Sequence, residues 1–147
     1  NTPINHEHVQ KARKICGEVL YEAMKCSPDI CPAVNRLCTT VAKPCDLWFD
    51  QAMWLVGYLA ARQKLNPRIT YKRRRTGDPI VPLFCGLSDS SFNTTQNGRS
   101  MLGWFVMLNN SLLSYHTGLS KVVTLTTTEA EAHALSDLCK EVLYLIQ

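Results

Sequence analysis

Apolar residues recur at helical spacing through the first half of the chain. Between residues 8 and 24 they return every three or four positions, which predicts an amphipathic helix ending before Pro28. A second helix is predicted from Pro28 to about residue 42. A third is predicted over residues 46–63, with Asp46 as its N-cap.

The second half contains shorter apolar runs bounded by turn residues. Three strands are predicted, over residues 80–88, 101–108 and 112–115, with Asn109-Asn110 as a tight hairpin turn between the last two. Gly103, inside the middle strand, indicates a bulge or the close approach of another backbone.

A final helix follows the strands. Thr128 and Glu131 have the spacing of a capping box, so the helix is predicted to begin there. Its apolar face is predicted at Leu135, Leu138, Val142 and Leu145. This face should pack across the sheet and place Glu131 at its first turn.

These elements predict an α+β protein. About three helices form a helical segment over residues 1–64, and a basic linker over residues 65–79 leads to an antiparallel ββ(β)α unit over residues 80–147. At 147 residues the chain is long enough to bury a core of its own. No apolar run reaches the roughly 18 residues that a membrane span needs.

Composition narrows the functional classes only a little. Charged residues make up 19% of the chain, below the roughly 25% of ordinary soluble domains, so we expect a partner to cover part of the surface. The net charge of +4 permits nucleic-acid binding without arguing for it. Seven cysteines without paired short spacings suit an intracellular, reducing compartment better than a disulfide framework.

Short motifs follow one another in a family-specific order. The chain has Ser-Pro-Asp-Ile at 27–30, Ala-Val-Asn-Arg-Leu at 33–37, Leu-Ser-Asp at 87–89, Gly-Trp at 103–104 and Thr-Thr-Thr-Glu-Ala-Glu at 126–131. Over about residues 15–147 this series resembles copia-type LTR retrotransposon polyproteins, in the ribonuclease H domain and the segment joining it to reverse transcriptase. The resemblance implies that the ββ(β)α unit is the first half of a ribonuclease H-like fold.

The resemblance also implies a pair of catalytic carboxylates. Asp89 would be the first ligand of a two-magnesium site and Glu131 the second, whereas the family's third and fourth acids lie beyond the final helix. We expect the chain to stop before that strand. Two carboxylates bind Mg²⁺ weakly and do not hold a pair of ions, so both are predicted to be vestigial. No cofactor is expected, except Mg²⁺ in a longer, active chain.

The third predicted helix departs from the family pattern. Lysine or arginine usually stands at the positions of Met53, Trp54 and Gly57, whereas this chain is apolar there. A contiguous exposed apolar patch is costly in a free monomer, which favours docking of other protein subunits. The predicted interaction residues are Trp48, Met53, Trp54 and Tyr58. The alternative is that the N-terminal helices cover this face.

One basic cluster is present in the linker. It consists of Lys72, Arg73, Arg74 and Arg75. Such a run either contacts nucleic-acid phosphates or lies in a solvated turn, and the sequence favours neither.

Two functions remain open. The chain is predicted to be a retrotransposon-derived, non-catalytic structural or protein-interaction subunit of a larger assembly, docking through its third helix and an open sheet edge. The alternative is a fragment of an active ribonuclease H-type endonuclease that hydrolyses the RNA strand of RNA–DNA hybrids by two-metal catalysis.

Overall fold

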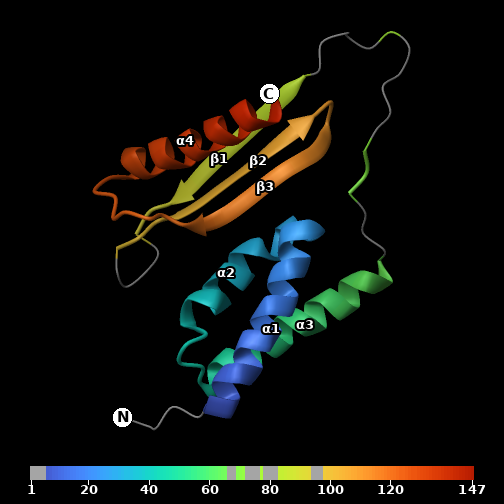
Figure 1. The fold of residues 1–147 in the computed structure, drawn as a ribbon, viewed down its shortest axis with the longest axis vertical. Helices are drawn as coiled ribbons and strands as arrows, with labels where there is room; N and C mark the ends of the chain where they lie inside the picture. The colour runs from blue at the N-terminus through green and yellow to red at the C-terminus, as the bar shows by residue number, and fades with distance from the viewer. Residues whose placement is uncertain (1–5, 66–68, 72–76, 78–82, 94–97) are drawn as a thin grey trace. The chain divides into compact units, whose positions relative to one another are not determined.

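The chain divides into two compact units, and each is described by itself. The computed structural model describes residues 6–65, 69–71, 77, 83–93 and 98–147. Residues 1–68 belong to one unit and residues 69–147 to the other. Helices form the first unit, and a three-stranded sheet with one helix forms the second (Figure 1), so the predicted α+β class is confirmed. None of the helices described here is long and apolar enough to cross a membrane.

The helical unit contains three α-helices and one short turn of 3₁₀-helix. They are α1 (His6–Lys25), η1 (Pro28–Ile30), α2 (Cys31–Thr40) and α3 (Asp46–Lys64). Pro28 opens η1 because its fixed φ suits the first helical position, where a backbone N–H is not needed. The three predicted helices are therefore confirmed, with ends that differ by a few residues.

The core of the helical unit collects side chains from every helix. Most of them are small or β-branched, so the helices can approach one another closely. The buried apolar residues are Val9, Ala12, Cys16, Val19, Ala23, Ile30, Cys31, Val34, Leu37, Trp48, Ala52 and Leu55.

α3 begins where predicted, but its N-cap is one residue earlier. Cys45 has the extended backbone of the cap position (φ −114°, ψ 175°), and no side chain accepts a hydrogen bond there. Asp46 is the first helical residue, where its negative charge lies near the positive end of the helix dipole. The predicted Asp46 N-cap is therefore wrong.

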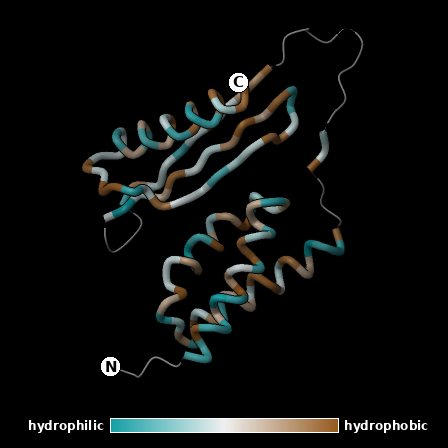
Figure 2. Tube along the Cα trace, in the orientation of Figure 1, coloured by the Kyte–Doolittle hydropathy of each residue, from teal (hydrophilic) through white to brown (hydrophobic). Residues whose placement is uncertain are grey.

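The second unit is built on an antiparallel sheet. Its strands are β1 (Phe84–Ser91), β2 (Met101–Leu108) and β3 (Ser111–Leu119), hydrogen-bonded in the order β1-β2-β3. The central strand, β2, is the most uniformly hydrophobic of the three (Figure 2). It is paired on both sides, so β1 and β3 are the edges among the described strands.

A tight hairpin joins β2 to β3. Asn109 and Asn110 both have positive φ, 50° and 63°, as in a type I′ turn, so the predicted turn is confirmed. The register shifts between Val106 and Met107, a few residues before this turn.

The strand ends differ from the prediction. β1 continues to Ser91, three residues beyond its predicted end, because Ser91 still pairs with Met101. β3 continues to Leu119 because the ladder with β2 persists past the apolar residues. Residues 80–82 of the predicted first strand lie outside the described residues.

α4 (Thr127–Leu145) packs against β1 and β2. Its buried residues are Ala130, Ala134 and Leu138, whereas Leu135 is 53% exposed. The predicted face that included Leu135 is therefore rotated relative to the observed one. Alanines occupy the buried positions because the helix lies close to the sheet.

One glycine shows how close this approach is. A Cβ added at Gly86 would lie 3.0 Å from the side chain of Leu138. At Gly103 an added Cβ would come no closer than 3.7 Å to Thr117, an ordinary contact. Neither the bulge nor the close backbone approach predicted for Gly103 is found there, and the tight contact at Gly86 is with a side chain.

Candidate functional site

Thr126 and Glu129, rather than Glu131, supply the side chains that cap the start of α4. Thr126 is the N-cap: its Oγ1 accepts a hydrogen bond from the Glu129 amide (3.1 Å). Oε2 of Glu129 accepts one from the Leu125 amide (2.7 Å). The predicted capping box of Thr128 and Glu131 is therefore wrong by two residues, and Glu131 lies exposed in the first turns of the helix.

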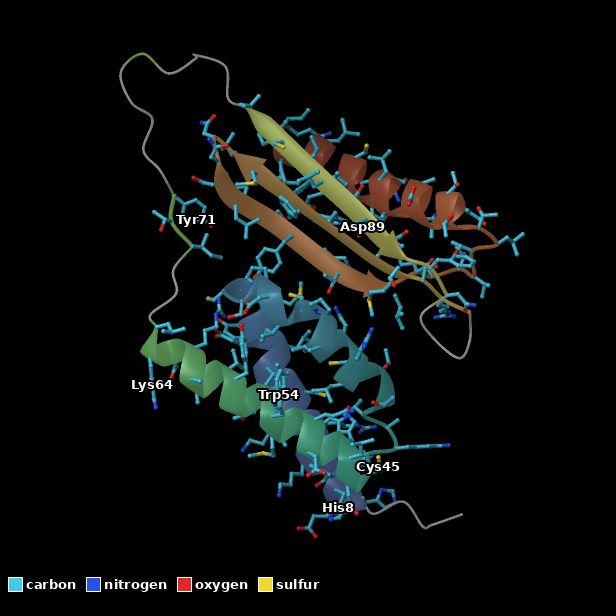
Figure 3. All side chains as sticks on the ribbon, turned by 180° about the vertical axis from the view of Figure 1, so that it is seen from behind. His8, Cys45, Trp54, Lys64, Tyr71 and Asp89 are labelled. Carbon is cyan, nitrogen blue, oxygen red and sulfur yellow. The ribbon has the colours of Figure 1, made fainter. Side chains whose placement is uncertain are left out.

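Asp89 lies near the end of β1, opposite Gly103 of β2 (Figure 3). It is exposed, and its Oδ1 accepts a hydrogen bond from the Ser90 amide (2.8 Å). Position 86 faces α4, and side chains alternate along a strand, so Asp89 leaves the sheet on the face opposite α4. The two carboxylates implied by the family resemblance therefore start from opposite sides of the sheet.

Asp89 and Glu131 do not by themselves provide the ligands of a two-metal site. Each Mg²⁺ takes about six oxygen ligands, and a pair of ions needs several carboxylates between them. Within the described ranges, no group of three or more His, Cys, Asp or Glu side chains is placed to hold a metal ion. Ser91, two residues after Asp89, is neutral and adds no carboxylate ligand.

The outer face of α3 carries large exposed apolar side chains. Trp54 is 71% exposed and Met53 is 59% exposed, and Tyr58 is exposed one turn further along. The rings of Trp54 and Tyr58 stack nearly parallel, with centroids 6.1 Å apart. Met53, Trp54 and Tyr58 are called the α3 outer face below.

Trp48 lies on the inner side of the same helix. It is 3% exposed, and its Nε1 donates a hydrogen bond to the carbonyl of Leu37 (3.1 Å). Phe49 packs edge-on against its ring at 5.1 Å. Trp48 is therefore a core residue, and its predicted place in an exposed interaction surface is wrong. The sequence pattern was ambiguous because α3 carries apolar residues on every one of its faces.

A polar cluster that sequence analysis missed joins α3 to η1. Arg62 Nη1 donates to Ser27 Oγ (2.6 Å) and forms an ion pair with Asp29 Oδ1 (3.3 Å). The Tyr58 hydroxyl donates to Asp29 Oδ2 (2.7 Å). This hydrogen bond favours the protonated phenol and so raises the pKa of Tyr58. The cluster holds one end of the α3 outer face in place.

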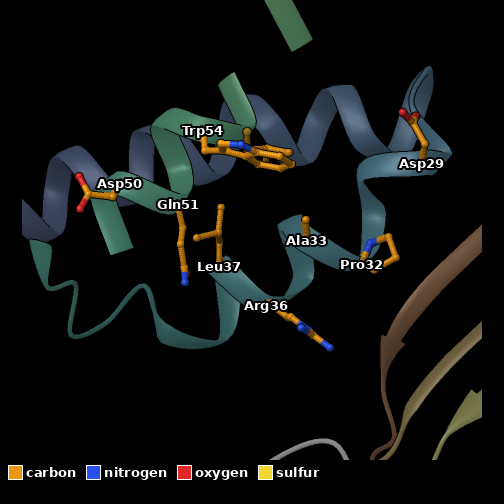
Figure 4. A pocket seen from close by; sticks show the side chains of 9 residues that line it. Asp29, Pro32, Ala33, Arg36, Leu37, Asp50, Gln51 and Trp54 are labelled. Carbon is orange, nitrogen blue, oxygen red and sulfur yellow. The ribbon is translucent and has the colours of Figure 1, made fainter. Parts of the chain in front are cut away.

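A pocket of about 690 Å³ lies between α2 and α3, beside Trp54 (Figure 4). Its lining combines apolar residues such as Pro32 and Leu37 with the charged side chains of Arg36 and Asp50. Trp54 therefore borders a hollow that can receive an apolar side chain, with charges of both signs nearby.

The predicted basic cluster falls in the linker. Lys72, Arg73, Arg74 and Arg75 lie outside the described residues. Their contact with nucleic acid stays a prediction.

Comparison with known proteins points to mobile elements. The chain is 26% identical over 135 residues to a retrovirus-related Pol polyprotein from the transposon TNT 1-94 of Nicotiana tabacum, a match covering 88% of this chain. It is 25% identical over 144 residues, 96% of the chain, to a truncated Ty1-A Gag-Pol polyprotein of Saccharomyces cerevisiae. Both of these relatives are retrotransposon polyproteins. The predicted resemblance to copia-type elements is thereby confirmed.

The matched segment is a small part of each polyprotein. It spans 9% of the tobacco polyprotein and 12% of the yeast one. A relative of a different kind is a secreted RxLR effector protein of Plasmopara viticola, 25% identical over 130 residues, 88% of this chain and 87% of that protein. No protein-family profile and no solved structure matches the chain.

Proposed function

We propose that this chain is a non-catalytic protein-interaction subunit derived from a copia-type retrotransposon polyprotein. The observation that carries the proposal is the α3 outer face, where Met53, Trp54 and Tyr58 are exposed together. Tryptophan, tyrosine and methionine are enriched at protein interfaces, and tryptophan and tyrosine are over-represented among the residues that dominate binding energy.

The α3 outer face is also held in one conformation. Tyr58 is fixed by its hydrogen bond to Asp29, and Trp54 stacks on the Tyr58 ring. A side chain that is already ordered loses less conformational entropy on binding, so more of its contact energy appears as affinity. The ordered pair of rings therefore favours a surface that binds a folded partner over two aromatic side chains that are exposed by chance.

The acid pair gives less support to a catalytic role. Asp89 and Glu131 start from opposite sides of the sheet, and they do not by themselves provide the ligands of two Mg²⁺ ions. The Plasmopara viticola relative matches over 87% of its length and is named an effector rather than a polyprotein. That relative supports a role for this segment apart from a complete polyprotein.

The competing function is ribonuclease H activity, which requires further acids supplied by a longer chain or a partner. We expect the 147-residue chain to leave an RNA–DNA hybrid intact in Mg²⁺ or Mn²⁺. Cleavage that disappears in the Asp89→Asn variant would establish the nuclease function and overturn the proposal.

A second experiment tests the α3 outer face directly. The Trp54→Glu variant should lose association with the native partner, because it places a charge in the centre of the apolar face. Tyr21→Glu is the matched control, since Tyr21 is an exposed aromatic on α1. Equal co-purification of both variants with the partner would remove α3 from the interface.

A further inference from the structure

The pocket beside Trp54 is a groove between two packed helices. Its apolar lining consists of Pro32, Ala33 and Leu37 from the α2 side and of Trp54 and Leu55 from α3. On the α2 side the lining positions run from residue 29 to residue 37. Eight steps along a helix span about 12 Å, so the groove is a little over two helical turns long.

The walls of this groove stand open to solvent. Trp54 is 71% exposed, and Pro32 and Ala33 on the facing wall are exposed as well. A typical small-molecule site encloses about 70–90% of the surface of its ligand, which requires walls on most sides. A groove that is open along its length instead suits one side of a polypeptide segment.

The backbone around the groove decides between a helix and a strand as that segment. Every lining residue belongs to η1, α2 or α3, and main-chain groups inside a helix pair within the helix. An extended segment would therefore bury its own N–H and C=O groups against apolar side chains without partners, which costs free energy. A helical segment pairs these groups internally, so the groove favours a helix.

Two opposite charges stand on the two walls. Arg36 extends from α2 and Asp50 from α3 (Figure 4). Neither side chain has an ion-pair or hydrogen-bond partner among the residues that the structure describes. Asp29, the remaining charged residue of the lining, is already paired with Arg62. A helix lying along the groove would thus have a cation beside one flank and an anion beside the other.

We propose that this groove binds an amphipathic helix of a partner protein. The buried face of that helix carries apolar residues one turn apart, at i and i+4, which are about 6 Å apart and fit the length of the groove. An acidic residue on one flank pairs with Arg36, and a basic residue on the other pairs with Asp50. The inference rests on the proposed function, because Trp54 belongs both to the α3 outer face and to the groove.

The test uses three synthetic helical peptides that share one apolar face. Each is alanine-rich and about 18 residues long, which is enough to form a helix in water. The bipolar peptide carries Glu on one flank and Lys on the other, the second peptide carries Glu on both flanks, and the third carries Lys on both. Fluorescence anisotropy of the labelled peptides measures their affinity for the full chain. The bipolar peptide should bind about three- to tenfold more tightly than the other two, since exposed ion pairs are individually weak.

A charge change on one wall should alter this order of affinity. In Asp50→Lys both walls are cationic, so the peptide with Glu on both flanks should become the tightest ligand. This comparison does not depend on which way the peptide runs along the groove. Glu18→Lys is the matched control: it makes the same change of charge at an exposed position of α1 and should leave the order as it was.

Further variants locate the binding site and identify the bound conformation. Trp54→Ala should weaken the bipolar peptide at least tenfold, whereas Tyr21→Ala, which removes an exposed aromatic from α1, should not. Peptide-induced changes in the amide NMR spectrum should be largest in α2 and α3. A proline in the middle of the bipolar peptide breaks its helix and should abolish binding. Equal affinity of the proline peptide would identify an extended segment as the occupant and overturn the inference.

Two other results would also overturn it. One is binding of the bipolar peptide that does not saturate up to about 1 mM, the range of very weak association. The other is an order of affinity that Asp50→Lys leaves unchanged. If the peptides fail to bind but Trp54→Glu still abolishes association with the native partner, this inference fails and the proposed function stands.

Discussion

The helical unit and the sheet unit close their cores in different ways. In the helical unit three helices surround one core, and even a large side chain, Trp48, is buried with its indole N–H paired. In the sheet unit a single helix lies on two strands, and alanines at 130 and 134 fill the contact. Three helices can shield one another, whereas one helix cannot cover both a sheet and its edge.

This difference determines what each unit leaves exposed. The helical unit leaves three large side chains exposed, namely Met53, Trp54 and Tyr58 on the α3 outer face. The sheet unit leaves main-chain groups of β1 unpaired within the described residues, together with exposed apolar side chains of α4 such as Leu135 and Ile146. The first surface suits recognition through inserted side chains, and the second suits pairing with a strand.

Removal of the buried indole is expected to cause the largest loss of stability in the helical unit. Trp48→Ala should lower the free energy of unfolding by about 3–5 kcal/mol, because it opens a cavity and leaves the Leu37 carbonyl without its donor. Trp54→Ala, six residues along α3 but exposed, should change it by less than about 0.5 kcal/mol. Denaturant unfolding measures both, and equal losses would contradict the assignment of Trp48 to the core.

The corresponding change in the sheet unit is Leu138→Ala. It should cost about 2–5 kcal/mol, because Leu138 is buried against Gly86 and the helix cannot close the gap without moving. Tyr144→Ala on the same helix should have little effect, since Tyr144 is exposed. Hydrogen exchange should show faster opening of α4 and β1 with the amides of α1 unchanged. Loss of protection in both units together would show that they unfold as one.

A smaller effect tests where α4 begins. Thr126→Ala removes the side chain that caps the helix and should cost about 1 kcal/mol. Thr128→Ala, at the position that sequence spacing favoured, should be close to neutral. Thermal unfolding of the two variants separates the alternatives, and a larger cost at Thr128 would restore the predicted capping box.

The rate of cysteine alkylation distinguishes buried from exposed thiols in the two units. Burial, and next the nearby Cys38 thiol, raise the pKa of Cys16 from 9.0 to about 12. Because thiolates react and thiols do not, Cys16 should be alkylated far more slowly at pH 8 than the exposed Cys45 or Cys85. Mass spectrometry of the alkylated peptides measures the rates. Modification of Cys16 at the rate of Cys45 would contradict its burial.

The same pKa shift gives a pH dependence with a definite sign. The folded protein holds the Cys16 proton more tightly than the unfolded chain does. This contribution to stability is complete below pH 9 and is lost as the pH rises towards about 12. In Cys16→Ala the fall in unfolding free energy over this range should be smaller than in the parent chain.

Much of the secondary structure followed from the sequence, because periodicity and turn residues act over a few neighbouring positions. The three helices of the first unit, strand β2 and the turn at Asn109 and Asn110 were all predicted. Cap positions were missed at Cys45 and Thr126, since several adjacent residues can accept the same hydrogen bond.

The candidate site was predictable only in part. Trp54 and Trp48 look alike in the sequence of an all-round apolar helix, and only packing against α1 and α2 decided which one is buried. The contacts among Ser27, Asp29 and Arg62 join residues more than 30 positions apart, and no local pattern encodes such a pairing.

By itself, the sequence determined the order and type of most elements, because these depend on the spacing of residues over short stretches. It also determined the similarity to retrotransposon polyproteins, which rests on residue identity. The tertiary structure alone decided which face of each helix meets a neighbour. It oriented α4 so that Leu138 packs against Gly86 and Leu135 is left exposed. Burial is a property of what lies opposite a residue, and that neighbour is supplied by the fold rather than by the adjoining sequence.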